Sequence, residues 1–304
     1  MRAGLLALGV LGALLPGQAM AYVRTTTETA KAFFWLDPNV RVTVYSKDPP
    51  PYLTREKLME AARQSAATWS YPQVDCTSMM LTVSELDEAE ASVAYDDVNR
   101  ITFRRIEWRK MPCDSSKESC SPYDSRALAI TSVFALKSSG RVIDSDMELN
   151  AVHYKWADVV TDAGTLNTPG EKVHDLQNTM THEFGHLIGF DHNCYDPSAG
   201  RPRATDNSGQ SVPNCSDATP AMRASTMFNS ASPLDVDKRD LAPDDIRAVC
   251  EIYPRGQAPI RPPGDDEEPG GCAVGRPSDG RRAGWALLLG LAGLGLVIRA
   301  RRRS

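Results

Sequence analysis

Three of the five histidines in the chain fall within one short stretch that also contains a glutamate: His182-Glu183-Phe184-Gly185-His186-Leu187-Ile188-Gly189-Phe190-Asp191-His192. His182 and His186 are four residues apart, so on a helix they lie on the same face and can present two imidazoles to one metal ion. Gly189 can adopt the left-handed conformation that ends a helix, and His192 can then return as a third nitrogen ligand. Three protein ligands leave a fourth position open, as in catalytic rather than structural zinc sites.

The residue types in this stretch predict hydrolysis. Zinc lowers the pKa of a bound water molecule toward about 7, which supplies hydroxide near neutral pH. Glu183, next to the first ligand, is placed to take the proton of that water and deliver it to the leaving amine. The alternative, core histidines on an apolar helix, gives no reason for three histidines at these spacings beside a glutamate. We therefore expect one catalytic Zn²⁺ at His182, His186 and His192.

This motif resembles the zinc-binding motif of the metzincin clan of metallopeptidases. Downstream, Ser225-Thr226-Met227-Phe228 resembles the Met-turn of that clan, which would place Met227 beneath the zinc as a packed thioether. Residues 241–249 are similar to the start of the C-terminal helix of matrixin-like members. Residues 140–150, followed by Trp156, are similar to the matrixin strand that precedes the active-site helix. The resemblance implies endopeptidase activity and a zincin domain, with a mixed twisted sheet, an active-site helix and a C-terminal helix.

The same resemblance implies where a protein or peptide substrate binds. Residues 127–136 would form the edge strand of the cleft, to which an extended peptide adds a further strand. Residues 228–234, after the Met-turn, would line the pocket beside the zinc. Asn193 follows the third histidine where matrixins usually have serine, which departs from that subfamily. Asn229 stands where astacin-like and serralysin-like enzymes carry an extra tyrosine ligand, so we expect no such ligand.

Two other functions could use the same residues. A surface binding or adhesion module could keep the metal site as a non-catalytic relic, but such a module has no chemical need for the carboxylate of Glu183. A zinc hydrolase could also cleave a non-peptide amide, such as cell-wall material. The sequence does not separate this last alternative from proteolysis, whereas a panel of substrates does.

The elements that must position the motif can be predicted from periodicity and capping. Thr54 can cap a helix that runs to about Trp69, a second helix covers about 175–188, and a third runs from Pro243 to before Pro254. Alternating and branched residues predict strands at 40–45, 79–83, 101–104, 129–136 and 142–149. This order of elements predicts one α+β domain over residues 22–253, acting as a monomer.

The composition argues against nucleic acid as a partner. The net charge is −5, and residues 22–275 alone hold 26 Lys and Arg against 38 Asp and Glu. Phosphate binding needs clustered Lys and Arg, which this acidic region does not offer. Asp144, Asp146 and Glu148 could bind Ca²⁺, but alternation along a strand gives the same pattern, and we do not expect a calcium site.

The N-terminus and the cysteines predict export. Residues 1–21 combine Arg2, an apolar run over 5–15 and the small-residue pattern Ala19-Met20-Ala21, which together are typical of a cleaved signal peptide. The apolar run is too short for a comfortable membrane anchor. Six cysteines in the domain allow up to three disulfides with 15 pairings. Cys113–Cys120 and Cys194–Cys215 are the local choices, which leaves Cys76–Cys250.

The amino-acid composition changes after residue 253, where the predicted domain ends. Residues 254–271, rich in proline and acidic residues, predict an extended linker. Cys272, an apolar run over 283–298 and terminal arginines resemble the C-terminal sorting signal of myxobacterial exported proteins. The resemblance implies that residues 272–304 are a sorting segment, with Cys272 as the attachment point at the cell envelope; the alternative is a permanent single-span anchor. Mass spectrometry of the mature protein tests this, because an intact 283–304 segment would contradict sorting.

Overall fold

The structure is a computed structural model, and it describes residues 22–112, 121–163, 166 and 172–259. All of these residues belong to the first of two compact units, residues 1–265. The predicted signal peptide, most of the predicted linker, the sorting segment with Cys272, and the pair Cys113 and Cys120 lie outside the described residues.

The described residues combine a six-stranded sheet, two two-stranded sheets and four α-helices. The elements are β1 (Val23–Arg24), β2 (Phe34–Trp35), β3 (Asn39–Tyr45), α1 (Arg55–Thr68), β4 (Met80–Leu86), β5 (Asn99–Arg104), β6 (Ala129–Ala135), β7 (Arg141–Asn150), β8 (Lys155–Ala157), β9 (Val173–Asp175), α2 (Leu176–Leu187), β10 (Phe190–Asp191), α3 (Pro220–Arg223) and α4 (Pro243–Ile252). The main predicted helices and strands are thus present within a few residues of their predicted bounds.

The six-stranded sheet is mainly parallel. Its strands follow the order β2-β7-β5-β3-β4, all parallel, and β6 pairs with β7 in the antiparallel sense. In β3, Val40, Val42 and Val44 are buried between more exposed neighbours, as the alternation of the sequence predicts. Among the described residues β6 pairs with β7 only, so its other side is a free edge. The fold is therefore a mixed arrangement of helices and strands, compatible with the predicted α+β class.

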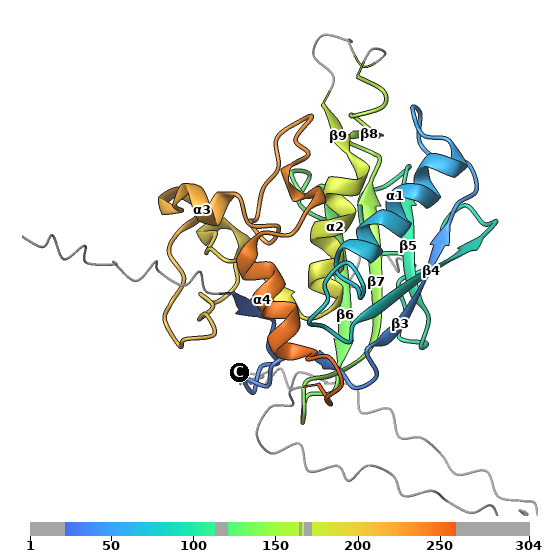
Figure 1. The fold of residues 1–304 in the computed structure, drawn as a ribbon. Coiled ribbons are helices and arrows are strands. Elements are labelled where there is room, and N and C mark those ends of the chain that lie inside the picture. Colours follow the sequence, from blue (N-terminus) through green and yellow to red (C-terminus); the bar gives the residue numbers. More distant parts are fainter. Residues whose placement is uncertain (1–21, 113–120, 164–165, 167–171, 260–304) are drawn as a thin grey trace, which may run out of the picture. The chain divides into compact units, whose positions relative to one another are not determined.

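Helices α1 and α2 lie side by side on one face of this sheet (Figure 1). The side chain of Thr54 caps α1 by accepting a hydrogen bond from the N–H of Lys57 at 3.2 Å, as the sequence predicts. Leu58, Ala62, Ser65 and Trp69 share the buried face of α1. The indole of Trp69 then donates to the carbonyl of Thr181 at 2.7 Å, which fixes α1 against the middle of α2.

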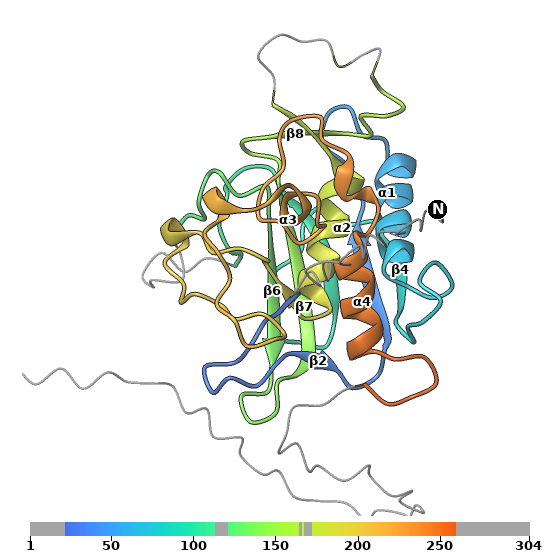
Figure 2. The same ribbon diagram turned by 60° about the vertical axis from the view of Figure 1, so that its left-hand side comes forward.

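Helix α4 lies beside α2 (Figure 2) and completes the same hydrophobic core. Tyr253, fully buried just after α4, donates from its hydroxyl to the carbonyl of Ile188 at 2.8 Å. The indole of Trp35 donates to the carbonyl of Leu187 at 2.8 Å. These two bonds satisfy carbonyl groups at the end of α2 that have no partner within the helix. The C-terminal end of α2 is therefore held from both α4 and the start of the sheet.

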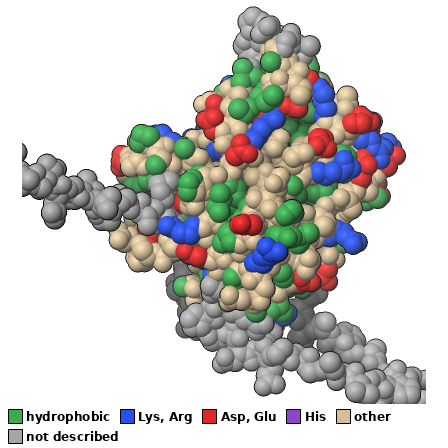
Figure 3. All heavy atoms as spheres, viewed as in Figure 1, with side chains coloured by type: hydrophobic (Ala, Val, Ile, Leu, Met, Phe, Trp, Pro, Cys, Tyr) green, Lys and Arg blue, Asp and Glu red, His purple; other side chains and the backbone are tan. Residues whose placement is uncertain are grey.

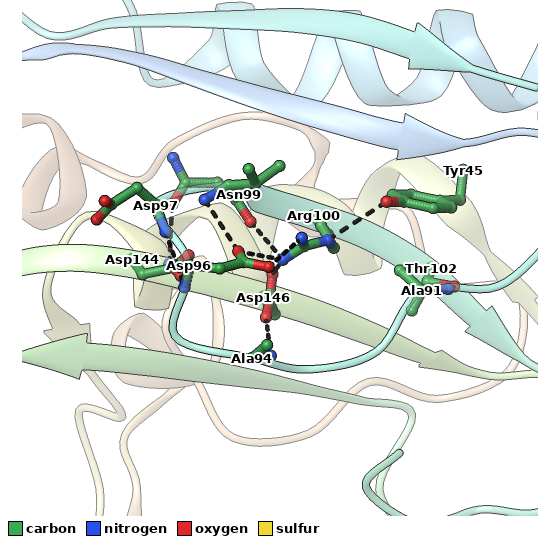
Figure 4. A network of polar contacts seen from close by, with 12 residues as sticks. Tyr45, Ala91, Ala94, Asp96, Asp97, Asn99, Arg100, Thr102, Asp144 and Asp146 are labelled. Atoms are coloured by element: carbon green, nitrogen blue, oxygen red, sulfur yellow. Dashed lines mark hydrogen bonds and ion pairs between the residues drawn. The ribbon is translucent and has the colours of Figure 1, made fainter. Parts of the chain in front are cut away.

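The face of β7 opposite this core carries the three carboxylates considered for calcium. Asp144, Asp146 and Glu148 are buried. Figure 4 shows that Asp144 accepts from the backbone N–H groups of Asp96 and Asp97, at 2.7 and 3.1 Å. Asp146 accepts from the N–H of Ala94 at 3.0 Å and faces the guanidinium of Arg100. Glu148 is paired with Arg104 at 2.6 Å. Through these hydrogen bonds and ion pairs, the carboxylates hold the segment 94–97 and the side chains of Arg100 and Arg104 against β7.

Two of the three predicted disulfides lie among the described residues. Cys76 and Cys250 connect the segment before β4 to α4, with their Cα atoms 5.3 Å apart. Cys194 and Cys215 close the loop that follows His192, with their Cα atoms 4.9 Å apart. These pairings are compatible with an extracellular protein.

The surface shown in Figure 3 mixes basic and acidic side chains without separating them into regions of one sign. Within the described ranges, no helix combines the length and the apolar character needed to cross a membrane. The apolar run at 283–298, where the sequence predicts a membrane segment, lies outside these ranges.

Candidate metal centre

The three histidines predicted as metal ligands come together in the structure. Helix α2 begins after Asp175, whose carboxylate caps it by accepting from the N–H of Asn178 at 2.8 Å. His182 and His186 lie one turn apart on this helix, and His192 directly follows β10. The three Nε2 atoms are 3.1 to 3.2 Å from one another. This group could hold a metal ion.

Gly189 makes the turn that brings His192 back toward α2. Its φ angle is +103°, and a Cβ atom at this position would lie 2.8 Å from the carbonyl oxygen of Phe33. Strand β10, just after this turn, pairs antiparallel with β1, and the N–H of Thr25 donates to the carbonyl of Gly189 at 2.9 Å. The position of His192 therefore depends on a glycine and on pairing with the start of the domain.

Backbone carbonyl groups orient two of the three imidazoles. Nδ1 of His182 lies 2.6 Å from the carbonyl oxygen of Thr226, and Nδ1 of His186 lies 2.8 Å from that of Phe190. A carbonyl oxygen only accepts, so each Nδ1 carries the proton and donates it. Nε2 of both rings then presents a lone pair to the common centre, which is the arrangement of a metal-ligating histidine.

The protonation of the histidines also suits metal binding. Burial lowers the pKa of both His182 and His192 well below the usual value. Nearby positive charges, including that of Lys238, act in the same direction. Metal ions bind the neutral imidazole, so these shifts favour the form that serves as a ligand.

The sulfur of Met227 lies against α2 at Gly185. A Cβ atom on Gly185, between His182 and His186, would be 2.2 Å from the sulfur of Met227 and 3.0 Å from the Trp69 ring. Gly185 therefore leaves the space that the thioether occupies. Met227 is buried, and its thioether packs against α2.

A buried aspartate holds the turn that contains Met227. Asp245, in the first turn of α4, accepts from the N–H of Thr226 at 2.8 Å and from the hydroxyl of Ser225 at 3.1 Å. The carbonyl of Thr226 is the group that accepts from His182. Asp245 thus connects α4, through Thr226, to His182, which is one of the candidate metal ligands. The sequence gives no sign of this role, because an aspartate in the first turn of a helix is ordinarily explained by the helix dipole.

Glu183 is 5% exposed and points toward β6, where its carboxylate accepts from the hydroxyl of Thr131 at 2.6 Å. Thr131 lies in the middle of β6. The strand therefore both lines the site and fixes the carboxylate beside the histidines. Nothing in the sequence marked Thr131, since one threonine in a strand is unremarkable.

A cavity of about 710 Å³ opens over the histidines. One wall is β6, with Ala129, Thr131 and Val133, and another is the segment from Asn229 to Pro233 that follows the Met-turn. The sequence predicted both segments as walls of a peptide cleft, and the structure places both on this cavity. His174 and Lys238 also line the cavity, and no motif in the sequence indicated that either would do so.

His174 and Lys238 are both buried, and burial shifts the pKa of each. Burial lowers the pKa of His174 to about 4, so its imidazole is neutral at pH 7. Burial also lowers the pKa of Lys238 to about 8, opposed by the charges of Glu183, Asp245 and Asp235. Most of the Lys238 side chains are therefore still protonated at pH 7.

No protein-family model matches the chain, and no curated protein matches it.

Proposed function

We propose that this protein is a zinc-dependent endopeptidase with a metzincin-like fold. The observation that carries the proposal is the convergence of three Nε2 atoms beside a buried glutamate, in the lining of a large cavity. The glycine turn before His192 and the methionine beneath α2 support the metzincin-like assignment.

The histidines fit zinc. With Zn–N distances of about 2.0 to 2.1 Å and tetrahedral angles, two ligand nitrogens are about 3.3 Å apart. The observed spacings of 3.1 to 3.2 Å are close to this value. Without a cation, lone pairs on at least two neutral rings face one another, because their protons are on Nδ1. Three nitrogen ligands without a thiolate or a fourth side chain are the donor set of a catalytic zinc site.

The roles of the protein groups follow from their positions. Bound zinc would act as a Lewis acid on the scissile carbonyl and lower the pKa of the attacking water. Glu183 would accept the proton of that water and pass it to the leaving nitrogen. Thr131 would hold the carboxylate in the orientation that both transfers require. The products are a new carboxyl terminus and a new amine, with one water molecule consumed.

Strand β6 supports a peptide as the substrate. Its free edge lines the cavity and runs past Glu183, so an extended peptide could pair with it and place a carbonyl group over the histidines. The disulfides support an exported enzyme, acting outside the cell or at its surface.

The proposal is tested by incubating the purified, zinc-loaded protein with a denatured protein substrate, beside Glu183→Ala. The wild type should cleave it, a chelator should abolish cleavage, and added zinc should restore it. The variant should bind one zinc per chain, measured by atomic absorption, but lose about 100-fold to 10,000-fold in kcat/KM, as expected for removal of a general base.

The alternatives give different results. A folded, zinc-loaded wild type that cleaves no protein or peptide would overturn the peptidase proposal. Release of soluble fragments from cell-wall material by the same preparation would then indicate a non-peptide amide hydrolase. If Glu183→Ala cleaves as fast as the wild type, the activity does not come from this site.

A further inference from the structure

The cavity beside the histidines contains a buried positive charge. Lys238 is 6% exposed and lies in the short 3-10 helix Asp237–Arg239, between the Met-turn and α4. Its backbone N–H donates to the side chain of Asn178 at 2.7 Å. Asn178 is in the first turn of α2, so this bond fixes Lys238 at the end of the cavity that the start of α2 lines.

The ammonium group of Lys238 is only partly satisfied. It donates to the carbonyl of Phe228. The carboxylates of Glu183, Asp245 and Asp235 act on its charge electrostatically, and among the described residues none of them forms an ion pair with it. An ammonium group has three donors, and a buried charge is costly to the fold unless it is paired. At least part of its hydrogen-bonding capacity is therefore available to a ligand in the cavity.

Other positively charged residues around the cavity also favour a negatively charged ligand. Arg126 and Lys172 are exposed residues of the cavity lining, and Arg201 lies on the lining as well. Against these cations the lining has two carboxylates, Glu183 and Asp191, of which Glu183 belongs to the proposed catalytic machinery. A protein with a net charge of −5 thus has a cavity lining with four cations, counting Lys238, and two carboxylates, and of the cations Arg126 is paired with Asp124 and Arg201 with Asp191. Such a cavity favours anionic ligands.

The direction in which β6 runs determines which half of a bound peptide lies near Lys238. Tyr154 donates from its hydroxyl to the carbonyl of Arg126, just before β6, at 3.2 Å. The Tyr154 ring also contacts His174, with ring centroids 5.0 Å apart, just before α2. The start of β6 and the start of α2 therefore meet at the Lys238 end of the cavity. A peptide paired antiparallel with β6 would place its C-terminal half at this end.

We propose that Lys238 is a specificity-determining residue, which binds the carboxylate of an Asp or Glu side chain directly after the scissile bond. The substrates are then proteins cleaved on the N-terminal side of acidic residues. This inference rests on the proposed peptidase function.

The test uses the zinc-loaded full chain and a library of peptides derived from a whole proteome, in which both ends of every cleaved bond are sequenced. Acidic residues should be enriched at the first position after the cut. Two matched synthetic peptides, with Glu or Gln at that position, then give a ratio of kcat/KM values. We expect a ratio of about 10 to 100 for the wild type, as for a hydrogen-bonded charge pair in a desolvated site.

Variants separate recognition from a structural role. Lys238→Met should reduce the Glu-to-Gln ratio to about 1, whereas Lys238→Arg keeps the charge and should retain a preference for Glu. Lys137→Met makes the same chemical change at a side chain that is 74% exposed and does not line the cavity, and it should keep the wild-type ratio. Both peptides are cleaved by the same preparation, so loss of folded enzyme cancels in the ratio.

The two proposals fail in different ways. Cleavage without an acidic preference after the cut, or with the preference only before it, would overturn the role of Lys238 and leave the peptidase assignment intact. An unchanged ratio in a folded Lys238→Met would do the same. If the wild type cleaves no peptide, the proposed function fails, and the inference about Lys238 fails with it.

Discussion

The hydroxyl of Thr131 is the contact that determines how the Glu183 carboxylate is oriented. It donates to Glu183 at 2.6 Å from the middle of an edge strand. Hydrogen bonds to ionised groups are shorter and stronger than those between neutral groups. If Glu183 transfers protons, its orientation relative to the attacking water and the leaving nitrogen must be kept through the reaction.

Replacement of Thr131 by valine should therefore lower activity without removing the metal. We expect kcat/KM to fall about 10-fold, from the loss of one charge-assisted hydrogen bond, with one zinc still bound per chain. Thr131→Ser keeps the hydroxyl and should stay within about three-fold of the wild type. Peptide hydrolysis and atomic absorption measure both effects. Equal losses in the two variants would show that packing of the side chain, rather than its hydroxyl, is required.

At the scale of elements, β7 is buried on both faces and carries acidic residues on one of them. Asp146 is 1% exposed, and burial raises its pKa to about 6, with the charge of Asp144 acting in the same direction. The N–H of Ala94 and the charge of Arg100 oppose this shift but do not cancel it. Between pH 4 and pH 6 the folded protein thus holds a proton that the unfolded chain has released. The free energy of unfolding contributed by this group rises as the pH falls from 6 to 4.

Replacement of Asp146 by asparagine removes this titration. The difference in unfolding free energy between the wild type and Asp146→Asn should shift by about 2 kcal/mol in favour of the wild type when the pH falls from 7 to 4.5. Urea unfolding of both proteins in EDTA measures it, because bound zinc would add its own pH dependence. Parallel stability curves for the two proteins would contradict the raised pKa.

At the scale of the whole molecule, the two described disulfides close loops of very different length. Cys76 and Cys250 are 174 residues apart, whereas Cys194 and Cys215 are 21 residues apart. The first bridge ties α4 to the segment before β4, and α4 carries Asp245, which holds the turn that contains Met227. The second closes only the loop that follows His192.

Removal of the long-range bridge should cost more stability than removal of the local one. Loop-closure entropy predicts about 5 kcal/mol for Cys76→Ser with Cys250→Ser, and about 3 kcal/mol for Cys194→Ser with Cys215→Ser. Urea unfolding of the two double variants measures the difference. A larger loss for the local pair would show that local packing, rather than chain entropy, dominates.

Local patterns in the sequence were enough to predict the local structure of this protein. Helices α1, α2 and α4 and the longer strands could be predicted, because their periodicity, caps and prolines act within a few residues. The three histidines could be predicted as one group for the same reason. Two lie one helical turn apart, and a glycine turn returns the third, so their meeting requires no distant contact.

The tertiary structure alone decided the surroundings of that group. Strands β1 and β10 are two residues each and have no periodic signal, yet their pairing positions the turn before His192. The contacts of Thr131 with Glu183, of Asp245 with Thr226 and of Lys238 with Asn178 join residues 19 to 60 positions apart. Such contacts depend on how layers pack, which no local pattern encodes. The three histidines that could hold a metal ion could therefore be found in the sequence, whereas the shape and charge of the cavity came only from the fold.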